Sequence, residues 1–195
     1  MQPWEVLERR YLLKRWWMNL RVDHVRLPDG TELPEFHVVE YPDWSCVVCF
    51  TERGDLVMVE QYRHGVERMS LEFPAGAVDA GESPLEAARR ELLEETGYAA
   101  ATWTLLGRCA PEPSKHTNMA HLYVALGARP VQRPQTDHGE QLRVCLLPPD
   151  EVAQRIAAGE VIHGVHLAAY FWARACGFFP SADPFPVPAT DASCP

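Results

Sequence analysis

The chain has 195 residues, of which 47% are hydrophobic, enough for one folded domain with at most a small appendage. Its formal net charge of −9 argues against a nucleic-acid polymer as partner, because such a partner requires a basic surface. The first ten residues are charged and no apolar run approaches about 18 residues. We therefore expect no signal peptide, no membrane span and a cytoplasmic location.

The first 45 residues are expected to form a strand module of their own. Residues 1–17 are rich in Trp, Arg and Leu, and residues 18–27 and 33–41 have strand-like compositions. Between the last two stretches lies a Pro-Asp-Gly-Thr sequence, and Asp-Gly between strand-like runs is a strong hairpin signal. The sequence thus predicts an antiparallel N-terminal module.

Beyond residue 45, short apolar runs alternate with turn residues and one strong helix. Strands are expected at residues 45–51, 56–62, 70–73, 102–109, 119–126 and 141–147. A helix capped by Asp150 is expected to end at Gly159, and a last helix over 164–176 is expected to bury Leu167, Tyr170 and Phe171. This order predicts an α+β fold, built as an α/β/α sandwich.

Six cysteines are scattered through hydrophobic segments and are expected to be reduced core thiols. Cys46 and Cys49 have C-x-x-C spacing within a strand-like run. Because residues i and i+3 of a strand point to opposite faces, this pair is not expected to bind zinc or form a redox site.

The most informative stretch runs from residue 76 to residue 98. Ser83 suits the N-cap of a helix, Pro84 its first position and Glu86 the third, which completes a capping box. Gly97 is expected to end the helix, since glycine tolerates positive φ. The buried stripe of this helix is expected to contain Leu85, Ala88 and Leu92.

The opposite side of this helix carries three carboxylates. Glu91 and Glu95 are one turn apart, and Glu94 is three residues from Glu91. Arg89 and Arg90 offset part of the repulsion, but a divalent cation would offset it far better, and Mg²⁺ prefers oxygen ligands. The alternative is a solvated acidic face.

The fixed positions of this stretch resemble the Nudix box without a gap. They are Gly76, Glu82, Arg90, Glu91, Leu92, Glu94, Glu95 and Gly97, and only Tyr98 stands where an aliphatic residue is commoner. Nudix hydrolases split a nucleoside diphosphate linked to another moiety, with Mg²⁺ or Mn²⁺ and water. The resemblance therefore implies a metal-dependent hydrolase with a mixed sheet between helices.

The resemblance also implies roles for individual residues. Glu91 and Glu95 are the first metal ligands for two or three ions, and Arg90 and Glu82 brace the loop against the helix. Arg90 and Glu94 are counted among the catalytic residues. The implied metal-binding residues are Ala75 (through its carbonyl), Glu82, Glu91, Glu94 and Glu95.

Within the family, the segments 59–63 and 71–76 look like the ADP-ribose pyrophosphatase branch. Arg63 is then a phosphate clamp, or else a surface arginine. Glu72 either touches a metal-bound water or is a polar strand-edge residue. Pro113, 16 residues after Gly97, matches a proline of that branch, although an ordinary loop proline is the alternative.

Two aromatic residues and one acidic loop complete the expected site. Trp4 and Phe36 fall near the stacking aromatics of that branch, with core or interface packing as the alternative. The catalytic base is expected in the loop 135–140, with Glu140 as the best match and Asp137 next; His138 is expected to be solvated. Lys115 and His116 are further candidates for substrate contact.

The expected organisation is an N-terminal module over 1–45, a Nudix domain over 46–177 and a Pro-rich, loose tail over 178–195. In the ADP-ribose branch, such an N-terminal module builds a homodimer and helps cover the nucleoside. The expected reaction converts ADP-ribose to AMP and ribose 5-phosphate. Alternatives are GDP-mannose, FAD, NADH, a dinucleoside polyphosphate or an oxidised nucleoside triphosphate as substrate, or a non-catalytic ligand sensor.

Overall fold

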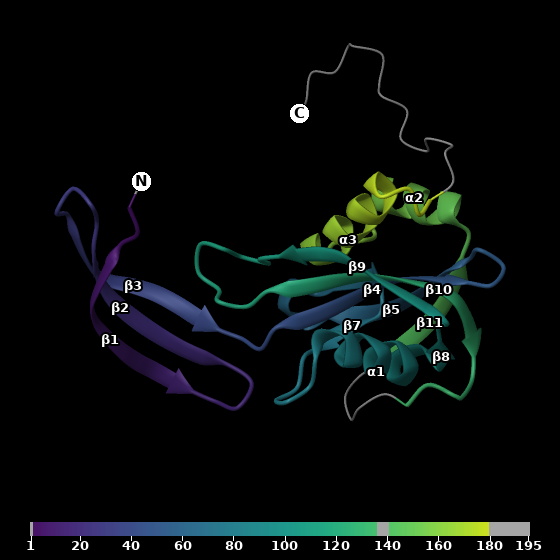
Figure 1. Ribbon diagram of the computed structural model, residues 1–195, viewed down its shortest axis with the longest axis horizontal. Coiled ribbons are helices and arrows are strands. Elements are labelled where there is room, and N and C mark those ends of the chain that lie inside the picture. Colours follow the sequence, from purple (N-terminus) through teal and green to yellow (C-terminus); the bar gives the residue numbers. More distant parts are fainter. Residues whose placement is uncertain (1, 136–140, 180–195) are drawn as a thin grey trace, which may run out of the picture.

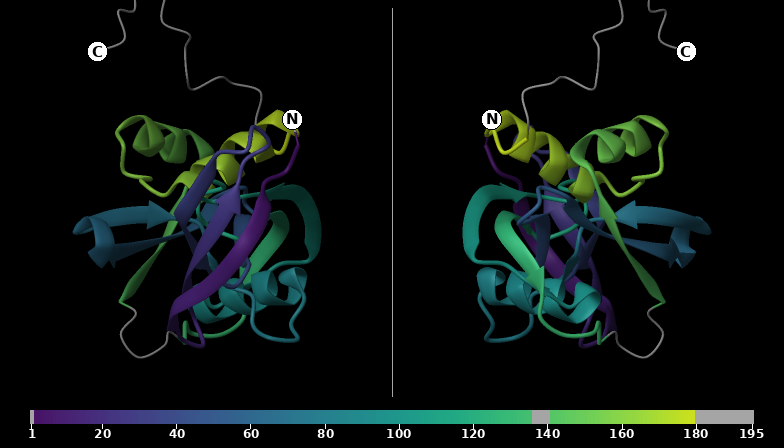
Figure 2. Two further views of the ribbon diagram at one scale, coloured as in Figure 1. Left: turned by 90° about the vertical axis from the view of Figure 1, so that its left-hand side faces the viewer. Right: turned by 90° about the vertical axis from the view of Figure 1, so that its right-hand side faces the viewer.

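The computed structural model describes residues 2–135 and 141–179 and contains two sheets. The smaller sheet is antiparallel in the order β1 (Glu5–Lys14), β2 (Asn19–Arg26) and β3 (Glu32–Glu40). It extends away from the rest of the molecule (Figure 1), and in the two views of Figure 2, taken from the two ends, it lies in front of the larger sheet on the left and behind it on the right. The expected hairpin between β2 and β3 is confirmed, with Gly30 at φ 88°.

The larger sheet has eight strands and follows the path β11-β5-β4-β10-β8. Its centre pairs β4 with β10 in parallel, whereas its other pairs are antiparallel, so the expected mixed sheet is confirmed. The short 3₁₀ helix η1 (His64–Val66) follows β5. The strands are β4 (Trp44–Thr51), β5 (Leu56–Arg63), β6 (Arg68–Glu72), β7 (Ala75–Ala77), β8 (Tyr98–Ala99), β9 (Thr102–Cys109), β10 (Ala120–Pro130) and β11 (Leu142–Leu147).

Helices cover both faces of this sheet (Figure 1). Helix α1 (Pro84–Thr96) packs on one face, and α2 (Pro149–Ala157) and α3 (Gly164–Ala175) pack on the other. This layering confirms the α/β/α sandwich. No helix among the described residues is long and apolar enough to cross a membrane.

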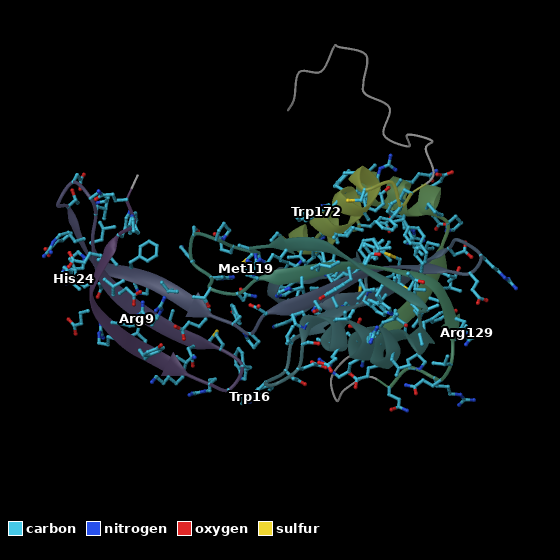
Figure 3. All side chains as sticks on the ribbon, viewed as in Figure 1. Arg9, Trp16, His24, Met119, Arg129 and Trp172 are labelled. Atoms are coloured by element: carbon cyan, nitrogen blue, oxygen red, sulfur yellow. The ribbon has the colours of Figure 1, made fainter. Side chains whose placement is uncertain are left out.

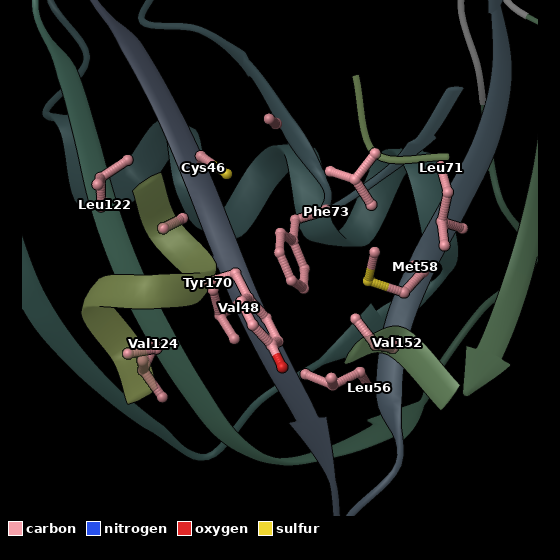
Figure 4. Packing of buried hydrophobic residues seen from close by; sticks show 14 of the residues in the cluster. Cys46, Val48, Leu56, Met58, Leu71, Phe73, Leu122, Val124, Val152 and Tyr170 are labelled. Atoms are coloured by element: carbon pink, nitrogen blue, oxygen red, sulfur yellow. The ribbon is translucent and has the colours of Figure 1, made fainter. Parts of the chain in front are cut away.

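Strand β4 separates the two cores by the simple alternation of its side chains. Cys46 and Val48 lie in the core under α2 and α3, which Figure 4 shows together with Tyr170, whereas Cys49 lies in the core under α1. The prediction that Cys46 and Cys49 face opposite ways is therefore confirmed. Burial raises the pKa of both thiols, Cys49 to about 12, so neither is a ready thiolate.

The C-terminal part corrects several expectations. Helix α2 is capped by Pro148 rather than Asp150, because two prolines set the extended start of the helix. Phe171 is 48% exposed, since it is turned away from the core that holds its neighbour Tyr170. Phe179 was expected in a loose tail, but its ring packs against Phe50 and Tyr170 in the core.

The cysteines also depart from one expectation. Cys176 is exposed rather than in the core, and Cys109 and Cys145 are only partly buried. Cys194 and the rest of the predicted tail beyond residue 179 lie outside the described residues.

Candidate active site

The loop before α1 and the helix itself have the local structure that the sequence predicts. The backbone N–H of Glu86 donates to Oγ of Ser83 at 3.3 Å, and the backbone N–H of Ser83 donates to Glu86 at 2.8 Å. Gly97 ends the helix at φ 76°. Oγ of Ser45 donates to the carbonyl of Pro84 at 2.7 Å, so the start of the helix is also tied to the central strand β4.

Arg90 makes hydrogen bonds to most of the carboxylates on the acidic face of α1 and in the loop before it. Its Nε and Nη2 donate to the two carboxylate oxygens of Glu82, each at 3.0 Å, and Nη2 also donates to the carbonyl of Ala77. Its Nη1 donates to Glu91 at 2.8 Å and to Glu94 at 3.2 Å. The hydrogen bonds from Arg90 lower the pKa of Glu82, and Arg90 ties the loop to the helix.

Two carboxylates converge on the backbone of residues 75 and 76. The N–H of Ala75 donates to Glu95, which is only 6% exposed, at 3.0 Å. A Cβ at Gly76 would lie 2.0 Å from the carboxylate of Glu91, so only glycine leaves this carboxylate its place. The 75–76 segment thus has the shape of a cradle for two acidic side chains.

The oxygen atoms gathered at residues 75 and 76 are suitable ligands for a hard divalent cation. Among the described residues, no three side chains of His, Cys, Asp or Glu already form a ready metal-holding group. The cradle nevertheless brings the carboxylates of Glu91 and Glu95 to the backbone segment that carries the Ala75 carbonyl, an all-oxygen set of the kind that Mg²⁺ and Mn²⁺ prefer. The metal-binding roles of these residues, and of Glu82 and Glu94, stay predictions.

Arg63 and Glu72 form an ion pair at the ends of β5 and β6. Glu72 is fully buried at the end of β6, a strand that pairs with β5, and both readings of its role stay open. Its carboxylate accepts from Nε of Arg63 at 2.8 Å and from Nη2 of the same guanidinium. Burial alone would raise the pKa of Glu72, but the hydrogen bonds and charge of Arg63 outweigh burial and lower it.

A cavity of about 880 Å³ opens beside the loop that precedes α1. Ala77 belongs to its wall and is also the carbonyl partner of Arg90, so the cavity adjoins the carboxylate cluster. Trp16 reaches it from the β1–β2 turn, which Figure 3 places near that loop. The cyclic side chains of the lining are Trp16, Trp17, Tyr41, Pro42, Trp44, Pro111, His116 and His163.

The two aromatic residues expected from the sequence to stack on the base, Trp4 and Phe36, are not among those that line the cavity. Trp4 and Phe36 pack edge to face at 5.5 Å within the N-terminal sheet, and neither borders the cavity. Trp16 and Trp17 were not selected, although two adjacent tryptophans before a strand were a usable signal. His163, stacked on Trp44 at 5.1 Å, gave no signal in the sequence.

The loop after β9 supplies part of the cavity. Pro113 is exposed in a turn, and the cavity is lined by Pro111 and His116 on either side of it. Of the two further candidates, His116 therefore lies at the cavity, whereas Lys115 is exposed and outside the lining.

The expected catalytic base lies outside the described residues, as do Asp137 and His138. The segment that leads to it is held by the end of α1. The carbonyl of Gly97 accepts from the N–H groups of Val131 and Gln132, and the carbonyl of Glu94 accepts from Gln135 at 2.7 Å. Glu140 therefore follows five residues after an anchor on the box helix.

Comparison with known protein families decides the relationship. The model described as "NUDIX domain" matches residues 41–166, which include the cradle, the helix and most of the sandwich. The chain belongs to the NUDIX domain family. A second model, "Nucleoside diphosphate sugar hydrolase N-terminal domain", matches residues 4–39 of this Nudix chain, the region of the small sheet.

Several known proteins are similar to most of the chain. An ADP-ribose pyrophosphatase of Mycobacterium tuberculosis is 37% identical over 151 residues, 76% of this chain and 72% of the relative. A methanol dehydrogenase activator of Bacillus methanolicus is 36% identical over 71% of this chain and 75% of the relative. A crystal structure of an ADP compounds hydrolase superposes with a TM-score of 0.78 over 90% of this chain and 95% of that one; at 22% identity it shows the shared fold.

Proposed function

We propose that this Nudix pyrophosphohydrolase cleaves ADP-ribose between its two phosphates, giving AMP and ribose 5-phosphate. The observation that carries the proposal is the cradle at Gly76, where the carboxylates of Glu91 and Glu95 meet backbone beside an aromatic cavity. The choice of substrate is supported by relatives named ADP-ribose pyrophosphatase in Mycobacterium tuberculosis and Bacillus subtilis, which are 37% identical over 76% of this chain and 35% identical over 55% of it.

The cation is proposed to be Mg²⁺, two or three ions per site, with Mn²⁺ as a substitute. The carbonyl of Ala75 and the carboxylates of Glu91 and Glu95 would hold it, with Glu94 and Glu82 nearby. When bound, such a cation neutralises diphosphate charge and increases the acidity of water. An acidic protein with a charge of −9 needs such local positive charge to accept an anionic substrate.

The remaining contacts come from the chain itself. The guanidinium of Arg63 offers planar donors for phosphate oxygens. The aromatic cavity offers Trp17, Tyr41 and Trp44 to a flat base, and its volume of about 880 Å³ lies in the usual range of small-molecule sites. Glu140 is proposed to accept the proton of the attacking water.

A homodimer is proposed to complete the nucleoside site. Trp4 and Phe36 belong to a sheet that extends away from the catalytic body, and Trp4 is 46% exposed. In one chain these residues therefore do not reach the cavity, but the same sheet of a second copy can supply them. We assign residues 1–45 to this interface, and residues 46–177 to catalysis.

A substrate panel tests the proposal. ADP-ribose, GDP-mannose, FAD, NADH and a dinucleoside polyphosphate are each incubated with enzyme and Mg²⁺, and nucleotide products are resolved by chromatography. We expect AMP from ADP-ribose with the highest kcat/KM of the panel. A higher kcat/KM for another compound would reassign the substrate, and binding without any product would indicate a ligand sensor.

A further inference from the structure

Three polar side chains form a line from the protein surface into the core: Arg63, Glu72 and His166. Glu72 and His166 are fully buried, whereas 33% of the Arg63 side chain is exposed. Glu72 accepts from both Nε and Nη2, so its carboxylate contacts one edge of the planar guanidinium. Gln61 adds a hydrogen bond to Glu72 at 3.2 Å.

His166, on α3, lies on the other side of the carboxylate. Its Nδ1 accepts from the backbone N–H of Phe73 at 3.0 Å, so the neutral ring carries its proton on Nε2. Nε2 lies 3.4 Å from Oε2 of Glu72. Burial lowers the pKa of His166 to about 3, which keeps the ring neutral at neutral pH. The ring is therefore oriented by the backbone on one side. On the other side its Nε2, which makes no hydrogen bond among the described residues, lies within contact distance of the Glu72 carboxylate.

A buried carboxylate destabilises the folded state unless its charge is compensated. A buried ion pair can often be replaced by apolar residues without loss of stability, so stability alone does not explain why Glu72 is buried here. Here the compensating charge is Arg63, whose side chain is 33% exposed at the rim of the core. Burial lowers the pKa of His163, which lines the aromatic cavity, and the positive charge of Arg63 lowers it further, against the opposing effect of Glu72. Glu72 and Arg63 thus both act electrostatically on a residue of the cavity wall, with opposite signs.

We propose that Glu72 and His166 are positioning residues that fix the orientation of Arg63 toward the substrate diphosphate. This role rests on the proposed function, in which Arg63 contacts phosphate. His166 orients Glu72, Glu72 holds one edge of the guanidinium, and the fixed guanidinium binds phosphate without first losing side-chain freedom.

A double-mutant cycle tests the line. His166→Leu removes the ring nitrogen that lies 3.4 Å from Glu72, and we expect it to raise KM for ADP-ribose about fivefold or more with a smaller change in kcat. His166→Gln keeps a donor at this place and should return KM to within about twofold of wild type. In an Arg63→Ala background, His166→Leu should change KM less than about twofold, because its effect passes through Arg63.

Val165→Ala is the matched control, because Val165 is a buried neighbour on α3 that the structure does not place in this line. It should lower the melting temperature while KM stays unchanged. An equal rise in KM for His166→Leu with and without Arg63 would overturn the proposal, since a general loosening of the core acts in both backgrounds.

An activity-independent arm separates this proposal from the proposed function. The Nε–H signal of Arg63 is followed by NMR in wild type, Glu72→Gln and His166→Leu. We expect a slowly exchanging signal that is lost in Glu72→Gln and shifted in His166→Leu. A signal that is the same in all three overturns the positioning role. If the signals move but no nucleoside diphosphate is cleaved, the proposed function fails and the held geometry of Arg63 remains.

Discussion

Strands β1 and β4 show how differently the two sheets are stabilised. No residue of β1 is buried, whereas every residue of β4 from Ser45 to Phe50 is buried. The small sheet buries few apolar side chains, Val22 and Val25 on β2 and Val38 on β3. It also has cross-strand ion pairs such as Arg9–Asp23 at 3.0 Å, and β1 exposes Val6, Tyr11 and Leu12. The catalytic body is held by two apolar cores. Strand β1, with its exposed apolar side chains, is therefore the part of the small sheet that a second surface could cover.

The largest expected effect lies in the body. Glu91→Gln and Glu95→Gln should each lower kcat at least about 100-fold, because each removes a charge that would hold the cation. Both keep an acceptor of the same size, so the melting temperature should stay close to that of wild type. Steady-state kinetics with Mg²⁺ and thermal melts check this, and near-normal rates in either variant would break the assignment of the site to α1.

The second-largest effect on kcat is expected from the proposed catalytic base, Glu140. Glu140→Gln should lower kcat about 10²- to 10⁴-fold with little change in KM, because proton acceptance is lost while substrate contacts are kept. Asp137→Asn is the matched comparison and should leave kcat near the wild-type value. The reverse ranking would move the base to Asp137, and two normal rates would place it outside this loop.

Two tryptophans, Trp17 in the cavity and Trp4 beside the small sheet, should respond differently to substitution. Trp17→Ala should raise KM for ADP-ribose roughly 5- to 150-fold, since stacking on a base contributes roughly 1–3 kcal/mol. Trp4→Ala should raise KM only if a second copy supplies that residue, and then most at high enzyme concentration, where dimers form. Kinetics across a dilution series, with sedimentation to follow assembly, distinguish a site within one chain from a shared site.

The smallest effect concerns acid stability of the body. The pKa of His166 is about 3 when folded, below its ordinary value of about 6.5, so the unfolded chain binds more protons between these values. The free energy of unfolding should therefore fall as pH falls from about 6.5 toward 3. His166→Gln should flatten this slope in urea titrations, and Val165→Ala should not. An unchanged slope in His166→Gln would show that the ring does not contribute.

The sequence predicted those features that depend on local chemistry. The capping box at Ser83, the stop at Gly97 and the alternation of Cys46 and Cys49 all follow from neighbouring residues, and all are confirmed. The cavity could not be predicted this way, because Trp16, Trp44 and His163 come from three distant segments. The burial of Phe179 was not predicted, because the prolines that follow it led us to expect a loose tail, whereas its ring packs against Tyr170.

Glu72 shows a second limit. A single carboxylate before the box gave no sign of its depth, and a charged residue is rarely fully buried. Only the meeting of β5, β6 and α3 reveals why it is tolerated, because Arg63 and His166 arrive from 9 and 94 positions away in the numbering.

Gly97 has a consequence for anyone who transplants loops among such enzymes. A Cβ at this residue would lie 2.2 Å from the carbonyl oxygen of Gln132. The glycine that ends helix α1 therefore also allows residues 131–135, which lead into the acidic loop, to pack closely against the helix end. The end of α1 and residues 131–135 are therefore fixed together, and a graft that replaces the loop should keep Gly97 and these residues as one piece.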